Sequence, residues 1–187
     1  PESHLYLALG DREHHKEDAQ TLDNHHGKLI RVTTDGHVPA GNPFAGKAGA
    51  MPHIWSYGHR NIQAAAVSPS GVLWVAEHGP LGGDELNLVL PGKNYGWPLI
   101  GYGKEYDGRA IGSGLTYAEG MEQPVKHWST IAPSGMAFAT TDRYGPGWKG
   151  SILIASLRGS LLRLEMKADR VVREHTVWIS QGERVRD

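Results

Sequence analysis

The sequence contains no cysteine among its 187 residues. Disulfide bonds, thiolate metal sites and cysteine nucleophiles are therefore excluded, and the redox compartment stays open. The sequence also lacks an apolar run near the roughly 18 residues of a transmembrane helix. Neither sign of charge is in excess, since 19 Lys and Arg face 20 Asp and Glu and the net charge is -1. This balance gives no general electrostatic reason to expect binding to nucleic acid or to an anionic membrane.

Glycine and large aromatic residues are what the sequence has in quantity. It contains 25 Gly, 6 Trp and 7 Tyr, and 39% of its residues are hydrophobic. That apolar fraction is enough for a folded core. Many turns between short, aromatic-rich apolar runs are typical of an all-β protein.

Three segments of the sequence share one pattern, in which an apolar strand is followed by a Gly-containing turn and a second strand of alternating polarity. The paired runs are SHLYLALGDR (3–12) with GKLIRV (27–32), GVLWVAEHGP (71–80) with DELNLV (84–89), and GSILIASLRG (150–159) with SLLRLEM (160–166). IQAAAVSPSG (62–71) and SGMAFATTDRYGPGWKG (134–150) supply a preceding strand for the last two pairs.

A strand, turn, strand, loop, strand unit that recurs in this way predicts the blades of a β-propeller. The spacing between the units exceeds the usual blade length of roughly 40–50 residues, so long insertions are expected, the largest over residues 91–130. Because propellers usually close with four to eight blades, about three blades predict roughly half of a ring. An all-β sandwich with repeated short strands is the alternative.

The 11 histidines and one glycine pattern invite metal and nucleotide hypotheses. His14-His15 and His25-His26 are adjacent pairs, and neighbours on an extended chain point to opposite faces, so each pair is expected to be solvated rather than to share one ion. GPGWKG (145–150) fits GxGxxG, but it leads into the strand SILIAS rather than into a helix N-terminus. We therefore expect no nucleotide site there.

Arginines near the ends of strand-like segments are stronger candidates. They are Arg60 in SYGHRN, Arg158 in SLRG, and Arg184 and Arg186 in ERVRD. The i,i+2 spacing in ERVRD places two guanidinium groups on one face of an extended chain. Such a pair suits a ligand with several carboxylates. Salt bridges to neighbours such as Glu183 and Asp187 are the alternative reading.

The segment EHGPLGGDELNLVLPGKNYGWP (77–98) is far longer than a simple strand connection requires. A Gly-Pro turn frees backbone carbonyl groups, and these suit a hard cation. Asp84 and Glu85 add carboxylate oxygens nearby. The alternative is a glycine-rich turn with two solvated acids.

Several motifs together resemble the soluble quinoprotein sugar dehydrogenases of the glucose/sorbosone dehydrogenase group. They are SYGHRN (56–61), EHGPLGGDELN (77–87), GKNYGWP (92–98), APSGMAF (132–138) and ERVRD (183–187), with LGDR (9–12), DAQ (18–20) and GKLIRV (27–32) toward the N-terminus. The resemblance covers essentially the whole chain, which in turn covers about half of a family member. It implies a six-bladed β-propeller, with this chain forming roughly blades 3–5 as one partial propeller over 1–187.

The resemblance also implies an activity and its cofactors. Members bind pyrroloquinoline quinone (PQQ) and calcium, and they oxidise the C1 hydroxyl of aldose sugars to lactones. A histidine base takes the hydroxyl proton, and the calcium polarises the quinone carbonyl as a Lewis acid. An aldose substrate, an external electron acceptor and a periplasmic or secreted location follow as expectations.

Site residues follow from the motifs by resemblance. The expected PQQ contacts are Arg60, Asn61, Tyr106, Trp128, Thr130, Arg158, Arg184 and Arg186. The expected calcium ligands are the carbonyl groups of Gly79 and Pro80 for the cofactor's ion, and Glu85 with the Tyr95 carbonyl for a second ion. Asp11 resembles the acid that orients the catalytic histidine.

Three departures from the family pattern matter. Ile62 and Ala64 stand where RNPQG is usual, and Arg158 stands where many members have lysine, which keeps the charge but changes the geometry. The family's catalytic histidine lies N-terminal to the segment that begins at Pro1, so we expect no general base in this chain. Two other functions stay open: a noncatalytic partial propeller, which could pair as a homodimer through open blade edges, and a calcium-dependent propeller lactonase.

Overall fold

The computed structural model describes residues 3–180 and 182–186, so Asp187 of the ERVRD motif lies outside the described residues. The chain folds into two compact units, each built from two stretches of sequence. Unit 1 contains residues 3–62 and Leu90–Gln123, and unit 2 contains Gln63–Val89 with residues 124–180 and 182–186. No helix of the described residues is long and apolar enough to cross a membrane.

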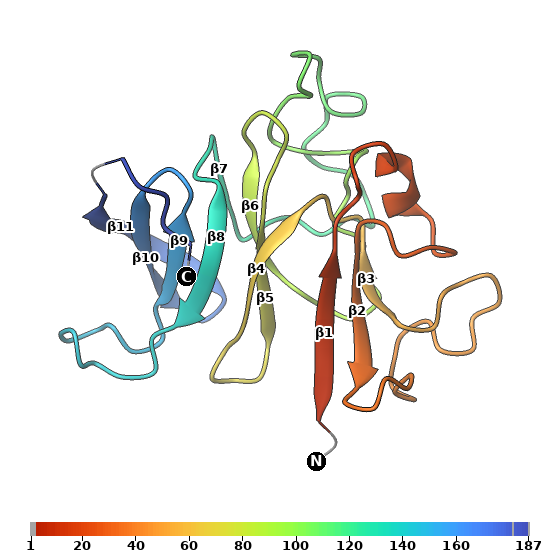
Figure 1. Cartoon of the computed structure of the whole chain (residues 1–187), viewed down its shortest axis with the longest axis horizontal. Helices are drawn as coiled ribbons and strands as arrows, with labels where there is room; N and C mark the ends of the chain where they lie inside the picture. Colours follow the sequence, from red (N-terminus) through yellow and green to blue (C-terminus); the bar gives the residue numbers. More distant parts are fainter. Residues whose placement is uncertain (1–2, 181, 187) are drawn as a thin grey trace. The chain divides into compact units, whose positions relative to one another are not determined.

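Unit 1 is built on a three-stranded antiparallel sheet in the order β1-β2-β3 (Figure 1). Its elements are β1 (His4–Leu9), β2 (Lys28–Thr33) and β3 (Ile54–Tyr57), with the short 3-10 helix η1 (Lys16–Gln20) between β1 and β2. The stretch Leu90–Gln123 carries no named strand and is held by isolated bridges such as Tyr57 with Asn94. Ala19, Trp97 and Ile111 form a small buried cluster in this unit.

Unit 2 contains two four-stranded sheets, whose strand orders are β4-β5-β6-β7 and β11-β10-β9-β8. The strands are β4 (Ile62–Val67), β5 (Leu73–Glu77), β6 (Asp84–Leu88), β7 (Lys126–Trp128), β8 (Pro133–Phe138), β9 (Ile152–Ser156), β10 (Ser160–Lys167) and β11 (Arg170–Ile179). In both sheets each strand lies beside its neighbour in sequence, as a meander does (Figure 1).

The apolar runs of unit 2 form strands whose side chains are buried in a shared core. Every residue of β5 is buried, which suits a central strand covered on both faces. The core cluster gathers side chains from both sheets: Ala64, Trp74, Ala76, Leu86, Trp128, Ile152, Ile154 and Leu164. Trp74 is only 2% exposed, and its ring meets Phe138 edge-on at 6.2 Å.

The all-β class is confirmed for the described residues, and the strand pairs expected at 3–12 and 27–32, at 71–80 and 84–89, and at 150–166 all form. The preceding strands expected at 62–71 and 134–150 form as β4 and β8. Two strands, β7 and β11, were not predicted, and β3 was indicated only by the strand-like segment that ends near Arg60. β7 has only three residues, and β11 pairs with β10 through two register shifts that blur the polarity pattern.

Candidate functional site

Asp11, Arg60 and Tyr106 come together in unit 1 around the indole of Trp97. The Trp97 Nε1–H donates to Asp11 Oδ2 at 2.7 Å, and the Asp11 backbone N–H donates to the Arg60 carbonyl at 2.9 Å. The Arg60 guanidinium lies over the Trp97 and Tyr106 rings, 5.4 and 5.6 Å from their centroids, and donates to the Tyr106 hydroxyl at 2.9 Å. Three predicted site residues therefore share one cluster.

The Asn61 side chain lies beside the same cluster. A Cβ on Gly10 would be 3.4 Å from the Arg60 carbonyl oxygen and 3.7 Å from Asn61 Oδ1. Gly10 therefore lets the LGDR segment run close to the Arg60-Asn61 pair. Asp11 is 6% exposed, and its other carboxylate oxygen accepts the Glu13 backbone N–H at 3.0 Å.

Gln20 of the DAQ motif ties the loop between β1 and β2 to the GKNYGWP block. Its side-chain amide exchanges hydrogen bonds with Asn94, at 3.0 and 2.8 Å, and also donates to the Trp97 carbonyl at 2.6 Å. These bonds fix the segment that carries Trp97. Hydrogen bonds thus join the DAQ and GKNYGWP motifs, which lie far apart in sequence, within unit 1.

Asp84 organises the glycine-rich turn of unit 2. Its Oδ1 accepts the Gly79 N–H at 3.0 Å, and its Oδ2 accepts the N–H groups of Ile131 and Ala132 at 2.7 Å each. Asp84 is 3% exposed. Its carboxylate therefore joins the Gly79-Pro80 turn to the loop that precedes β8.

Two carboxylates face each other across β5 and β6. Glu77 pairs with Glu85 in the sheet register, and the Asn87 Nδ2 amide donates to both, at 3.0 and 3.2 Å. Burial, and then the negative charges of Glu77 and Asp84, raise the pKa of Glu85 to about 8. Asn87 is fully buried, and its Oδ1 has no hydrogen-bond partner among the described residues.

This arrangement fits a hard cation. Carboxylate and amide oxygens are the donors that calcium prefers. A divalent ion would relieve the repulsion between the two carboxylates. A flip of the Asn87 amide, which exchanges Nδ2 and Oδ1, would turn its oxygen, unpaired among the described residues, toward that ion.

Thr130 and Arg158, both expected as PQQ contacts, lie side by side in unit 2. The Arg158 Nε–H donates to Thr130 Oγ1 at 3.2 Å, and both residues are exposed. The Ser156 hydroxyl holds this region by donating to the Ile131 carbonyl and accepting the Arg158 N–H at 3.0 Å. The guanidinium group is thus presented from an anchored turn.

Arg184 and Arg186 flank an anchored residue, Val185. The Val185 N–H donates to the Ser156 carbonyl at 3.1 Å, and its carbonyl accepts the Ser134 hydroxyl at 2.6 Å. Both arginines are exposed, and neither forms an ion pair within residues 3–180 and 182–186. The salt-bridge alternative therefore finds no support among these residues.

Trp128 and Tyr95 are placed mainly by packing. Trp128 belongs to the unit 2 core, and its Nε1–H donates to Glu174 at 2.8 Å. Tyr95, in unit 1, stacks on His59 at 4.6 Å, and its hydroxyl accepts the Leu90 N–H at 2.9 Å. The proposed cofactor contact of Trp128 and the proposed calcium contact of the Tyr95 carbonyl stay predictions.

Sequence reasoning assigned no role to several residues that build these clusters. Trp97 and Gln20 stood inside recognised motifs, and Asn87 follows Glu85 at i,i+2, which places it on the same strand face. That spacing could have identified Asn87. No local signal pairs Gln20 with Asn94, because their contact depends on the fold.

The described residues form an all-β protein in which Arg60 and Arg158 lie in loops and Glu77 and Glu85 pair across two strands. The chain belongs to the glucose/sorbosone dehydrogenase family, whose family model matches residues 1–187. It is 41% identical to the aldose sugar dehydrogenase YliI of Escherichia coli over 188 aligned residues, which cover 98% of this chain and 50% of that protein.

Solved structures agree with this membership. A crystal structure of glucose dehydrogenase matches with a TM-score of 0.92 and 45% identity, over 98% of this chain and 54% of that one. The PQQ-bound aldose sugar dehydrogenase of Streptomyces coelicolor matches with a TM-score of 0.76 and 32% identity, over 98% of this chain and 48% of that one. The chain thus spans about half the length of these relatives.

Proposed function

We propose that this chain is the cofactor-binding part of a PQQ- and calcium-dependent dehydrogenase that oxidises the C1 hydroxyl of aldose sugars to lactones. The observation that carries the proposal is the family match over all 187 residues. The PQQ-bound relative from Streptomyces coelicolor supports the choice of cofactor. An external electron acceptor and a periplasmic or secreted location belong to the same proposal.

We further propose that the sheets are blades of a six-bladed β-propeller, roughly blades 3–5. The sequential strand order of the three sheets supports this architecture.

Bound PQQ would supply the two-electron redox chemistry that side chains lack. Arg60, Asn61 and Tyr106 would bind and orient the cofactor in unit 1. The same role is proposed for Trp128, Thr130, Arg158, Arg184 and Arg186 of unit 2. Guanidinium groups suit its carboxylates because they donate two parallel hydrogen bonds.

Asp11 would orient a histidine base supplied from outside this chain. Its carboxylate accepts the Trp97 indole N–H and the Glu13 backbone N–H, and its own backbone N–H donates to the Arg60 carbonyl, so the carboxylate is held in a fixed direction. A carboxylate that accepts the Nδ1–H of an imidazole fixes the tautomer that can take a proton.

The carbonyl groups of Gly79 and Pro80 are proposed ligands of the cofactor's calcium, and Glu85 with the Tyr95 carbonyl is proposed for a second calcium. The Glu77, Glu85 and Asn87 cluster supports the Glu85 assignment, because it concentrates oxygen donors and negative charge. Asp84 uses both its carboxylate oxygens on backbone N–H groups, and we assign it to shaping the turn.

Dye reduction by the full-length protein tests the activity. With PQQ and calcium added, we expect glucose to reduce an artificial acceptor, and methyl glucoside, whose C1 hydroxyl is blocked, not to do so. Equal rates with both sugars would contradict oxidation at C1. A glucose rate no higher than that of a buffer blank would contradict the activity as a whole.

Replacement of Arg60 by glutamine should weaken PQQ binding by roughly 10- to 100-fold, the value of one charge-assisted hydrogen bond. Equilibrium dialysis of the full-length protein with PQQ measures the effect. Arg173→Gln, at an exposed position of β11, is the matched control and should bind as the parent does. Equal affinities for the Arg60 and Arg173 variants would contradict the assignment.

Replacement of Glu85 by glutamine should have opposite effects on the unfolding free energy without and with calcium. Without calcium the pKa of Glu85 is raised from 4.5 to about 8 in the fold. A raised carboxylate pKa contributes stability that is complete below about pH 4.5 and is lost as pH rises through about 8. In chelator, the parent should therefore lose roughly 2–4 kcal/mol of unfolding free energy over that window, and Glu85→Gln should not.

With saturating calcium the parent should be more stable than Glu85→Gln, because the bound ion stabilises the parent and the variant lacks that ion. Thermal unfolding across pH, with and without calcium, provides the measurement. Glu119→Gln, at an exposed position, is the control and should follow the parent. A calcium-induced rise in Tm that is the same in Glu85→Gln as in the parent would rule out Glu85 as a ligand.

A further inference from the structure

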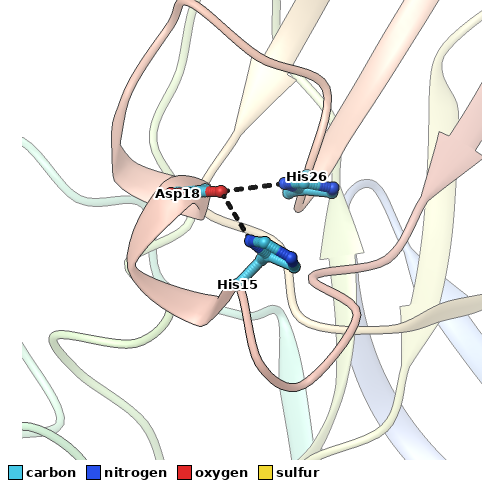
Figure 2. A group of neighbouring side chains, drawn as sticks. All are labelled: His15, Asp18 and His26. Atoms are coloured by element: carbon cyan, nitrogen blue, oxygen red, sulfur yellow. Dashed lines mark hydrogen bonds and ion pairs between the residues drawn. The ribbon is translucent and has the colours of Figure 1, made fainter.

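The loop between β1 and β2 brings together one histidine from each adjacent pair. His15 Nδ1 and His26 Nδ1 lie 3.2 and 2.9 Å from the same atom, Asp18 Oδ2 (Figure 2). The two imidazole rings stack, with centroids 4.4 Å apart and planes inclined by 21°. The three ligand atoms all lie within 4.8 Å of one another.

These separations are close to what a tetrahedral metal ion requires. Zinc lies about 2.0–2.2 Å from nitrogen and carboxylate oxygen, so two ligand atoms of a tetrahedral site are roughly 3.3 Å apart. The two nitrogen–oxygen separations, 3.2 and 2.9 Å, are both slightly shorter than that value, as hydrogen-bonded atoms are. Small side-chain rotations would complete the geometry.

The backbone that carries these side chains is held in place. His15 precedes η1 and Asp18 lies within it, and residues three apart align in a 3-10 helix. The buried Lys28 ammonium donates to the carbonyl groups of Asp18, at 2.8 Å, and His26, at 2.5 Å. Asn24 accepts the His26 N–H at 2.8 Å and donates to the Asp18 carbonyl at 3.3 Å.

The hydrogen bonds of Lys28 and Asn24 favour metal binding, because a preorganised set of ligands loses little conformational freedom when an ion enters. The Lys28 ammonium donates to the carbonyl oxygens of Asp18, Ala19 and His26 and to Asn24 Oδ1, and none of these bonds uses the Asp18 carboxylate.

We propose that His15, Asp18 and His26 form a binding site for a divalent transition-metal ion, zinc foremost, with water at the fourth position. Two imidazole nitrogens and one carboxylate oxygen select zinc and its neighbours in the first transition row. Calcium and magnesium prefer six or more oxygen ligands, which this cluster does not offer. The site is therefore separate in residues and in metal chemistry from the proposed calcium sites.

Metal binding would replace the two hydrogen bonds that Asp18 Oδ2 now shares with His15 and His26. Each imidazole would bind the ion through Nδ1, with its hydrogen on Nε2.

A bound ion would tie η1 to the start of β2. The same loop carries Gln20, which bonds the Trp97 carbonyl, and Lys16, which pairs with Glu105 at 2.7 Å. Metal binding should therefore stabilise unit 1, and the gain should grow with the logarithm of metal concentration.

Calorimetric titration of the untagged full-length protein with zinc chloride tests the proposal, in buffer that holds saturating calcium. We expect one zinc site that is lost, or weakened at least about tenfold, in His15→Ala and in His26→Ala. His14→Ala is the matched control, since His14 is exposed and adjacent to a ligand, and it should bind zinc as the parent does. Co²⁺ loaded at the site should show visible absorption of the tetrahedral type in the parent and in His14→Ala alone.

Asp18→Asn keeps the size of the ligand side chain and removes its charge. It therefore provides a second test if an alanine variant fails to fold. Thermal unfolding without metal should show Asp18→Asn folded, and zinc should then raise its Tm less than that of the parent. Equal zinc affinity in the parent, His15→Ala and His26→Ala would overturn the proposal. An equal loss of affinity in His14→Ala would also overturn it.

Discussion

Replacement of Gly27 by alanine should lower the unfolding free energy by about 3 kcal/mol or more. Gly27 has φ +63°, in the left-handed region, and a Cβ there would lie 2.4 Å from the His59 carbonyl oxygen and 2.5 Å from Ala19 Cβ. His59 also donates its N–H to the Gly27 carbonyl at 3.1 Å. The variant must therefore displace the segment between β3 and β4 that carries Arg60. On the proposed assignment of Arg60, PQQ binding should weaken along with stability.

Gly36→Ala provides the matched control. Gly36 has φ +87°, and nothing lies within 4 Å of its added Cβ, so this variant should lose only the backbone cost of about 1–2 kcal/mol. Denaturant unfolding of both variants isolates the close approach as the difference between them. Equal losses would show that the contact with His59 and Ala19 relaxes without cost.

Replacement of Asp84 by asparagine should destabilise unit 2 by roughly 2–4 kcal/mol. The carboxylate accepts three backbone N–H groups, from Gly79, Ile131 and Ala132. Asparagine has only one acceptor oxygen, and its NH₂ group would face an N–H donor in a buried place. Ala132 has φ +49°, so the loop holds a strained residue that these bonds stabilise.

Hydrogen exchange gives the specific measurement for Asp84→Asn. We expect faster exchange at Gly79, Ile131 and Ala132, along with a lower Tm. Asp169→Asn, in an exposed turn of the same unit, is the control and should change neither. If Asp84→Asn left the exchange of these three amides unchanged, its role as the link between the two loops would be wrong.

Much of the fold could be predicted because its strands depend on local pattern. β5 is a continuous apolar run that ends in a glycine-rich turn, and β9 and β10 are separated by one such turn. β11 could not be predicted in the same way. It mixes apolar and polar residues without regular alternation, most of them exposed, and its pairing with β10 shifts register twice.

The candidate site was predictable where a motif names a side chain and unpredictable where a side chain acts through a distant partner. Arg60 and Arg158 came from their motifs. The link from Asp84 to Ile131 spans 47 residues, and the contact between Gln20 and Asn94 spans 74. His25 packs against His53 while His26 contacts His15 and Asp18, so this adjacent pair has separate surroundings. The sequence could not show that one member of each pair would meet at Asp18.

The division of each unit into two stretches of sequence sets an order for folding during synthesis. Residues 3–62 cannot complete their unit until Gln123 has left the ribosome, and by then Gln63–Val89 have already emerged. β6 must wait longer, because its partner β7 begins only at Lys126. Until then its edge exposes unpaired backbone groups, which invite pairing with other chains. A ribosome that pauses while residues 90–125 emerge should therefore hold a nascent chain whose exposed β6 edge is prone to aggregation.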